Sequence, residues 1–293
     1  MTIDVDAPVR REFKHFAYDQ FHIYSELGAF GLRVYTPSTR LIDEREMQPN
    51  ISVAYGNGWA QGVDAVNDIG ERLARDGHMR FAALKLPLGD HEVADMVPFR
   101  TEMLRSVSDV LLEEYPDDSQ VIMGYSRGSS PAAIVAGERS DLVAGVSFVA
   151  PTWFGGEHTS ISLALRAAEE GAGAIFRDSP RDRIDLVKLA YHALREAARR
   201  PSELKRDVAA IARESRPADL IRRLDGVARI GVVIGDHDGL CRAEEIAAVA
   251  KEIEDSNPSR DVDIRRVRSD HFHVFTNAQS RAEIIDQIKK IAT

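Results

Sequence analysis

The chain has 293 residues, of which 44% are hydrophobic and 29% are charged, and its formal net charge is -9. This length suits one large α/β domain or two smaller ones, and the composition is ordinary for a soluble globular protein. The negative net charge argues against a nucleic-acid partner and against binding to an anionic membrane surface.

Cysteine content and hydrophobicity narrow the class of protein further. Cys241 is the only cysteine, so an intramolecular disulfide and a cysteine-based metal cluster are both excluded. No segment approaches the ~18 consecutive apolar residues that a membrane span needs. The first 16 residues lack the apolar centre of a signal peptide. We therefore expect a cytoplasmic protein with no membrane partner.

The first half of the chain alternates strand patterns with amphipathic helix patterns. Residues 21–36 surround a Gly-Ala-Phe-Gly centre at 28–31, which predicts a β-hairpin. Gly77 is expected to cap the first helix. Strands are expected at 50–58, 79–87, 119–124 and 142–150, and helices at 63–77, 99–116 and 130–138. This alternation predicts a mostly parallel sheet flanked by helices on both faces, with the hairpin as an antiparallel edge.

The second half begins with a change of pattern. Residues 152–224 contain several helical patterns and no convincing strand. Alternation then resumes with strands at 227–235 and 262–268 and helices at 243–254 and 280–292. A helical block inserted between two strands of one sheet is how a cap is built. We therefore predict an α/β core domain from residues 1–151 and 225–293, with a helical cap at 152–224.

Residues with catalytic chemistry follow four of the expected strands. Ligands and catalytic groups gather beyond the carboxyl ends of the strands in a parallel sheet, so these residues are the candidates for a site. In chain order they are Gly56-Asn57-Gly58-Trp59, Gly124-Tyr125-Ser126-Arg127-Gly128, Asp236-His237-Asp238 and Ser269-Asp270-His271-Phe272-His273. A serine, then an acid, then a histidine, each at a strand end, is a more specific pattern than any single member.

With these residues the chain resembles the α/β-hydrolase fold superfamily over most of its length. Gly124 to Gly128 matches the G-x-S-x-G nucleophile elbow in its strand–turn–helix context. The resemblance implies a serine hydrolase of carboxylesterase or thioesterase type that acts on a small-molecule acyl substrate without a cofactor. Ser126 would be the nucleophile, His271 the base and Asp238 the acid that orients the histidine.

Two of these roles have neighbouring alternatives. Gly235-x-x-Asp238 resembles the acid pattern of the superfamily, and Asp236 is then expected to be a turn or helix-capping residue. The Asp-His-Phe grouping at 270–272 resembles the histidine segment of polyketide-type thioesterases and favours His271, with His273 as a packed or exposed neighbour. The sequence leaves both alternatives open.

The resemblance also implies an oxyanion hole and an acyl pocket. The backbone N–H groups of Arg127 and Asn57 would hold the oxyanion. Gly58 is an alternative to Asn57, because Tyr55 stands where many relatives carry histidine. The Arg127 side chain is expected to be exposed and paired with a local acid, unless it meets a substrate carboxylate. Four aromatic residues are candidates to line an acyl pocket, each with core packing as the alternative: Trp59, Tyr125, Trp153 and Phe154.

Other classes of function account for less of the sequence. The glycines of "YGNGWAQG" are spaced one residue too far apart for a dinucleotide fingerprint, and the next strand ends in Lys85 rather than an acid. The adjacent residues 236–238 would seldom all point at one ion, and no second ligand cluster has suitable spacing, so no metal site is expected. A ligand sensor or catalytically impaired protein, a C–C bond hydrolase and a cofactor-free haloperoxidase-like enzyme remain alternatives on the same fold. The oligomeric state is left open, with a homodimer among the options.

Overall fold

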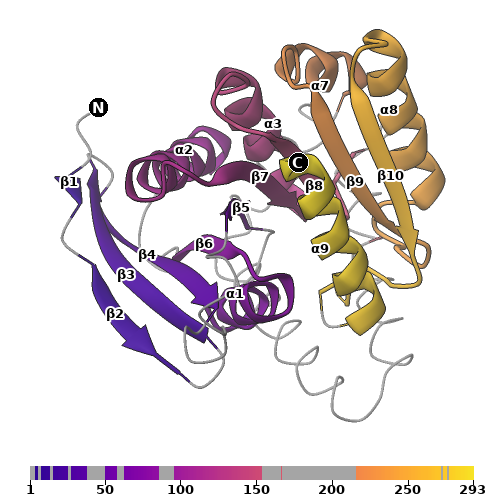
Figure 1. Ribbon diagram of the computed structural model, residues 1–293. Coiled ribbons are helices and arrows are strands. Elements are labelled where there is room, and N and C mark those ends of the chain that lie inside the picture. The colour runs from indigo at the N-terminus through magenta and orange to yellow at the C-terminus, as the bar shows by residue number, and fades with distance from the viewer. Residues whose placement is uncertain are drawn as a thin grey trace.

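The computed structural model describes residues 4–5, 8–13, 16–25, 28–37, 50–57, 63–85, 96–153, 166, 216–271, 273–275 and 277–293. Within these ranges the protein is a twisted sheet covered by helices on both faces (Figure 1). No described helix is long and apolar enough to cross a membrane.

The sheet has ten strands in the order β1-β3-β4-β6-β5-β7-β8-β9-β10, and β2 pairs with β3. Along this order, each strand from β6 to β10 runs parallel to the next, whereas β1 to β4 pair antiparallel and form one edge, with β4 antiparallel to β6. Their bounds are β1 (Asp4–Val5), β2 (Val9–Glu12), β3 (Phe16–Ser25), β4 (Gly28–Pro37), β5 (Ile51–Gly56), β6 (Arg80–Lys85), β7 (Ser119–Tyr125), β8 (Gly145–Val149), β9 (Arg229–Gly235) and β10 (Asp261–Val267). The mostly parallel sheet with an antiparallel edge is as predicted.

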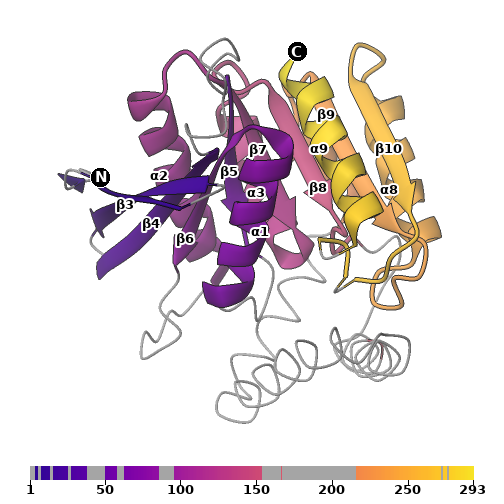
Figure 2. The same cartoon turned by 60° about the horizontal axis from the view of Figure 1, so that its bottom comes forward.

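Helices cover the two faces of the sheet in two groups. The helices α2, α3, α7 and α8 lie side by side on one face, and α1 and α9 pack together on the other (Figures 1 and 2). Their bounds are α1 (Val63–Gly77), α2 (Met96–Glu114), α3 (Ser129–Glu138), α7 (Pro217–Arg223), α8 (Ala243–Ser256) and α9 (Ala278–Ala292). Each face has its own apolar core, because side chains alternate between the faces along each strand.

Strand β7 shows how this alternation prepares the site. Val121, Met123 and Tyr125 point into the core beneath α1 and α9, whereas Ile122 points into the core beneath α2 and α3. All three residues of β7 from Val121 to Met123 are fully buried. A strand buried on both faces in the middle of a sheet is a rigid support for whatever follows its carboxyl end.

The turn of the predicted hairpin lies elsewhere than expected. Strand β3 ends at Ser25 and β4 begins at Gly28, so the Gly-Ala-Phe-Gly sequence is part of β4 and the connection is residues 26–27. Phe30 and Leu32 on β4 are buried in the core beneath α2. Burial of these apolar side chains sets the register of the strand, and it outweighs the turn preference of the two glycines.

The end of α1 also differs from expectation. Gly77 is the last helical residue, and His78 takes the left-handed conformation (φ 51°) that glycine was expected to supply. Met79 directly after it is buried in the core beneath α1. The chain must turn sharply there because β6 begins at Arg80.

Most of the predicted cap lies outside the described residues. Its last part, α7, packs against α3 and α8, and Leu220 and Leu224 belong to the core on that face. The division into a core domain and a cap at 152–224 therefore stays a prediction.

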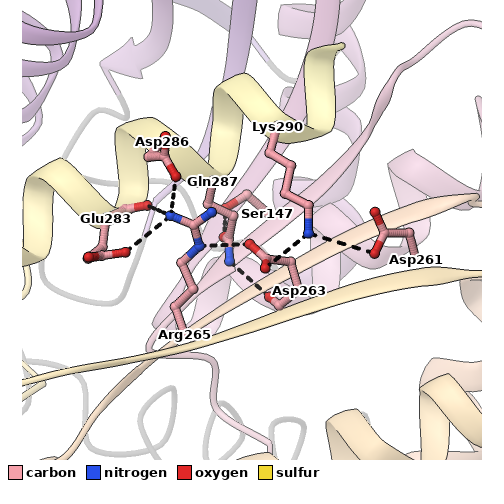
Figure 3. A network of polar contacts seen from close by, with 8 residues as sticks. All are labelled: Ser147, Asp261, Asp263, Arg265, Glu283, Asp286, Gln287 and Lys290. Carbon is pink, nitrogen blue, oxygen red and sulfur yellow. Dashed lines mark hydrogen bonds and ion pairs between the residues drawn. The ribbon is translucent and has the colours of Figure 1, made fainter.

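A polar network joins α9 to β10, the strand at one edge of the sheet (Figure 3). The buried Gln287 accepts a hydrogen bond from the Ser147 hydroxyl (2.9 Å) and donates one to the Asp263 carbonyl (3.0 Å). Burial raises the pKa of the Asp263 carboxyl, but hydrogen bonds from Arg265 and Lys290 outweigh it and leave the pKa below its ordinary value. Arg265 also pairs with Glu283 and Asp286 of α9. The network ties together β10 and α9, the two elements on either side of the segment 268–277 that carries His271 and His273.

Candidate active site

Ser126 occupies a strained corner between β7 and α3. Its φ is 51°, in the left-handed region that costs a residue with a Cβ roughly 1–2 kcal/mol. Gly124 and Gly128 flank it because neither position has room for a side chain. A Cβ on Gly124 would lie 2.7 Å from the Ala132 Cβ, and one on Gly128 would lie 2.6 Å from the Gly56 carbonyl carbon. We refer to residues 124–128 as the elbow.

Two hydroxyl groups satisfy the carbonyl of the strained residue. Ser129 donates a hydrogen bond to the Ser126 carbonyl oxygen at 2.6 Å, and Thr152 donates to the same oxygen at 3.4 Å. Such support from surrounding groups is what allows an unfavourable backbone conformation to persist. Neither residue stands out in the sequence, because short hydroxyl side chains occur in many turns and helix starts.

Ser126, His271 and Asp238 form one chain of hydrogen bonds. His271 Nε2 lies 2.8 Å from Ser126 Oγ, and its Nδ1 lies 2.7 Å from Asp238 Oδ2. The other carboxylate oxygen of Asp238 accepts hydrogen bonds from the backbone N–H groups of Leu240 and Cys241. Since the carboxylate can only accept, the shared proton sits on Nδ1 and leaves Nε2 to accept from the serine hydroxyl.

Of the neighbouring acids and histidines, Asp238 and His271 lie in one hydrogen-bond chain with Ser126. Asp236 is exposed and its carboxylate lies 3.7 Å from Arg266, whereas the Asp238 side chain is fully buried against His271. His273 points at Asp270, with Nδ1 2.8 Å from the carboxylate. Asp270 also accepts the backbone N–H of His273, so this pair closes a local turn beside His271.

These side chains come from three strands of the parallel part of the sheet, in which β9 and β10 are neighbours and β8 lies between β7 and β9. Ser126 follows β7, Asp238 follows β9, and His271 follows β10. The loops after β9 and β10 are hydrogen-bonded to each other, from the N–H of Asp236 to the Val267 carbonyl and from the N–H of His237 to the Ser269 carbonyl. The strand ends thus bring together residues that are up to 145 positions apart in the chain.

The peptide between Gly56 and Asn57 lies against the elbow. The close approach of Gly128 to Gly56 places this peptide, which carries the Asn57 N–H, beside the start of α3. Arg100 of α2 donates a hydrogen bond to the Asn57 carbonyl (2.9 Å), and the Asn57 side chain donates one to the Leu84 carbonyl (3.4 Å). These bonds orient the backbone after β5. Sequence reasoning missed Arg100, which carries no motif.

The remaining predicted residues have varied positions. Gly58, Trp59 and Phe154 lie outside the described residues. Trp153 is buried with its ring edge-on to Phe148, and Tyr125 is buried beneath the loop that carries His271. The expectation of an exposed Arg127 side chain is wrong, because that residue is only 2% exposed. Arg127 lies in the short helix Ser126–Gly128 between β7 and α3, and all three residues of that helix are buried.

One group among the described residues has the residue types and spacing of a metal site. Possible ligand atoms of Asp238, Cys241 and His271 lie within 4.8 Å of one another, and all three residues are buried. Both ring nitrogens of His271 and both oxygens of Asp238 already have hydrogen-bond partners in the protein. An ion there would have to break the Ser126–His271–Asp238 chain, so this donor set fits a hydrogen-bonded relay better than a resident metal.

Comparison with known proteins supports the fold. No family model and no curated protein sequence matches the chain. Solved structures match along nearly its whole length. A carboxyl esterase from Bacillus coagulans has a TM-score of 0.63 at 13% identity, covering 96% of this chain and 100% of that one. Carboxyl esterase 2 from the fungus Tuber melanosporum has a TM-score of 0.61 at 15% identity, covering 97% and 88%.

An S-formylglutathione hydrolase from Agrobacterium tumefaciens has a TM-score of 0.56 at 16% identity, covering 100% of this chain and 99% of that one. At these identities the likeness concerns the fold. The strand order, the two helical layers and these similar structures together define the class: the protein has the α/β-hydrolase fold, as its sequence predicted.

Proposed function

We propose that this protein is a serine hydrolase that cleaves an ester or thioester of a small-molecule substrate through an acyl-enzyme. The observation that carries the proposal is the hydrogen-bond chain from Ser126 Oγ through His271 to Asp238, at 2.8 and 2.7 Å. It starts at a strained elbow and lies at the carboxyl edge of a parallel sheet, where this fold gathers its reactive groups.

The reaction follows from the donor and acceptor roles in that chain. Ser126 Oγ attacks the substrate carbonyl carbon while its proton passes to His271 Nε2. Asp238 keeps the ring in the required tautomer and stabilises the imidazolium. The tetrahedral intermediate collapses, and the leaving alcohol or thiol takes the proton from Nε2. Water then repeats the sequence against the acyl-enzyme, releases the acid and restores the Ser126 hydroxyl.

The charge on the tetrahedral oxygen needs fixed donors. We assign this role to the backbone N–H groups of Arg127 and Asn57. The first follows Ser126 directly, at the start of the short helix that leads into α3. The second belongs to the peptide that Gly128 contacts and that Arg100 holds through the next carbonyl. Donors held in place before the reaction stabilise an oxyanion without reorganising.

Two observations support an ester or thioester as the substrate. The similar structures include carboxyl esterases and an S-formylglutathione hydrolase. The Asp270-His271-Phe272 grouping resembles the histidine segment of polyketide-type thioesterases. Both substrate classes present a carbonyl carbon with a leaving group that His271 can protonate.

A fluorophosphonate probe for serine hydrolases tests the proposal. Wild-type protein should become covalently labelled and should turn over p-nitrophenyl esters or acyl thioesters, and Ser126→Ala should abolish both activities. Ser106→Ala is the matched control, because Ser106 is also buried but donates to the Glu102 carbonyl within α2. Equal labelling of the Ser126→Ala variant, or a folded wild type that neither labels nor turns over substrate, would reject the proposal in favour of a sensor or impaired relative.

A further inference from the structure

Tyr125, the residue before Ser126, lies beneath the loop that carries His271. Alternation along β7 points its side chain into the core beneath α1 and α9, where it is 5% exposed. Its ring lies 5.5 Å from the His271 ring and meets the Phe275 ring edge-on at 5.2 Å. These contacts place the Tyr125 side chain in the core beneath the site. They do not support the prediction that it lines an acyl pocket.

The Tyr125 hydroxyl donates a hydrogen bond to the backbone carbonyl of His271 at 2.7 Å. Burial raises the pKa of this hydroxyl well above its ordinary value, and the nearby Tyr55 and Asp238 raise it further. The hydroxyl therefore keeps its proton and remains a donor over the whole pH range in which a histidine base works. The bond joins the elbow to the backbone of the same residue whose imidazole contacts Ser126.

Such a connection matters because of where the two segments originate. Strand β10 lies at the edge of the sheet, separated from β7 by β8 and β9. We call residues 268–277, between β10 and α9, the base loop; 272 and 276 lie outside the described residues. Its backbone is hydrogen-bonded to the loop after β9, from the His237 N–H to the Ser269 carbonyl. The Tyr125 bond extends across those strands to the elbow itself.

We propose that Tyr125 is a positioning residue whose hydroxyl holds the base loop at the elbow and so sets the distance between His271 Nε2 and Ser126 Oγ. The inference rests on the proposed serine-hydrolase function and adds a residue to it. The Tyr125 hydroxyl acts through the backbone carbonyl of His271, which takes no part in the reaction. Tyr125 and Ser126 are adjacent in the chain, so the two groups that His271 contacts, the Tyr125 hydroxyl and Ser126 Oγ, belong to one short and rigid stretch of backbone.

Tyr125→Phe tests the hydroxyl while keeping the ring and its contacts with His271 and Phe275. Loss of the bond lets the base loop shift, and a misplacement of about 1 Å in a catalytic group can lower a rate about 100-fold. We expect kcat to fall about 10- to 100-fold and KM to change less than about 3-fold, because substrate binding does not involve this bond. The rate of fluorophosphonate labelling should fall by the same factor as kcat.

Tyr35→Phe is the matched control. Tyr35 is buried in the same core cluster, but it lies on β4, at the antiparallel side of the sheet and away from the elbow. Titrating the active sites with the fluorophosphonate probe gives the amount of folded, reactive protein. The measured rate can then be expressed per active site. A merely structural role predicts that both variants lose folded sites and keep the rate per site, and that result for Tyr125→Phe would overturn the proposal.

The activity of the wild type and an NMR measurement keep the test decisive. If the wild type shows no labelling or turnover, the proposed function fails and positioning is rejected with it; an active wild type with an equally active Tyr125→Phe variant rejects positioning alone. Should Tyr125→Phe fail to fold, NMR of the wild type takes its place. The Tyr125 hydroxyl proton should exchange slowly with water and show a nuclear Overhauser effect to His271 Hα, and its absence would contradict the hydrogen bond.

Discussion

Gly128→Ala should impair catalysis by displacing the peptide that we assign to the oxyanion hole. The added Cβ would lie 2.6 Å from the Gly56 carbonyl carbon and 2.9 Å from the Asn57 carbonyl oxygen. Carbon atoms in contact are normally about 3.5–4.0 Å apart, so the segment must retreat by about 1 Å. The Gly56–Asn57 peptide moves as one planar unit, and its N–H moves with it.

The expected loss follows from that displacement. Removing one oxyanion donor typically lowers kcat about 100- to 1000-fold, and a donor shifted by about 1 Å should approach this limit. KM should change little, because the donor interacts most strongly with charge that develops in the transition state. Overpacking should also cost about 1–3 kcal/mol of stability, so activity must be measured well below the melting temperature.

Steady-state kinetics on an activated ester, with active sites titrated by the fluorophosphonate probe, provides the measurement. Gly145→Ala is the control: its Cβ would lie 2.8 Å from Ile291 Cγ2, at the start of β8 and away from the elbow. Both variants should lose stability, and only Gly128→Ala should lose kcat per site. A Gly128→Ala enzyme with kcat within about 3-fold of wild type would refute the assignment of the Gly56–Asn57 peptide.

Three further predictions concern the acid, the core and the pH dependence of stability. Asp238→Asn should lower kcat about 10³- to 10⁴-fold by favouring the wrong histidine tautomer, whereas Asp236→Asn should leave it nearly unchanged; similar losses in ester turnover would contradict the assignment. Gln287→Met should lower the free energy of unfolding in urea by about 1–3 kcal/mol, because the buried hydroxyl of Ser147 loses its partner, and adding Ser147→Ala should restore part of it. Burial raises the pKa of Tyr35 to about 12. The folded state thus keeps a proton that the unfolded chain loses near pH 10, and the free energy of unfolding should fall by up to about 1.4 kcal/mol per pH unit between pH 10 and 12. Tyr35→Phe should make that decline shallower in alkaline urea titrations, and an unchanged slope would count against the shift.

Alternation of strands and helices was predictable because it depends on local patterns. Apolar runs such as 119–125 and the spacing of apolar residues in 243–256 reflect which side chains must be buried, and that requirement acts on neighbouring residues. Glycines around Ser126 were informative for the same reason, since a sharp turn excludes a Cβ within the turn itself. The parallel sheet followed from the alternation, and the comparison with solved structures confirms the fold.

Choices between neighbouring residues depended on contacts that are distant in the chain. Asp236 and Asp238 both follow β9, and His271 and His273 both follow β10, so the sequence alone left each pair open. The paired loops after β9 and β10 place Asp238 against His271, and His271 against Ser126. The hairpin turn was misplaced for a related reason, because burial of Phe30 against α2 sets the register of β4.

The sequence by itself therefore determined the α/β fold, the elbow and the set of residue types available for the site. Only the tertiary structure decided that Asp238 and His271 join Ser126 in one hydrogen-bond chain, that Arg127 is buried, and that the hydroxyl of Tyr125 reaches the His271 carbonyl. The physical reason is the range of the forces involved. Turn geometry and hydrophobic periodicity are properties of adjacent residues, whereas a hydrogen bond across four strands exists only after the sheet has brought those strands together.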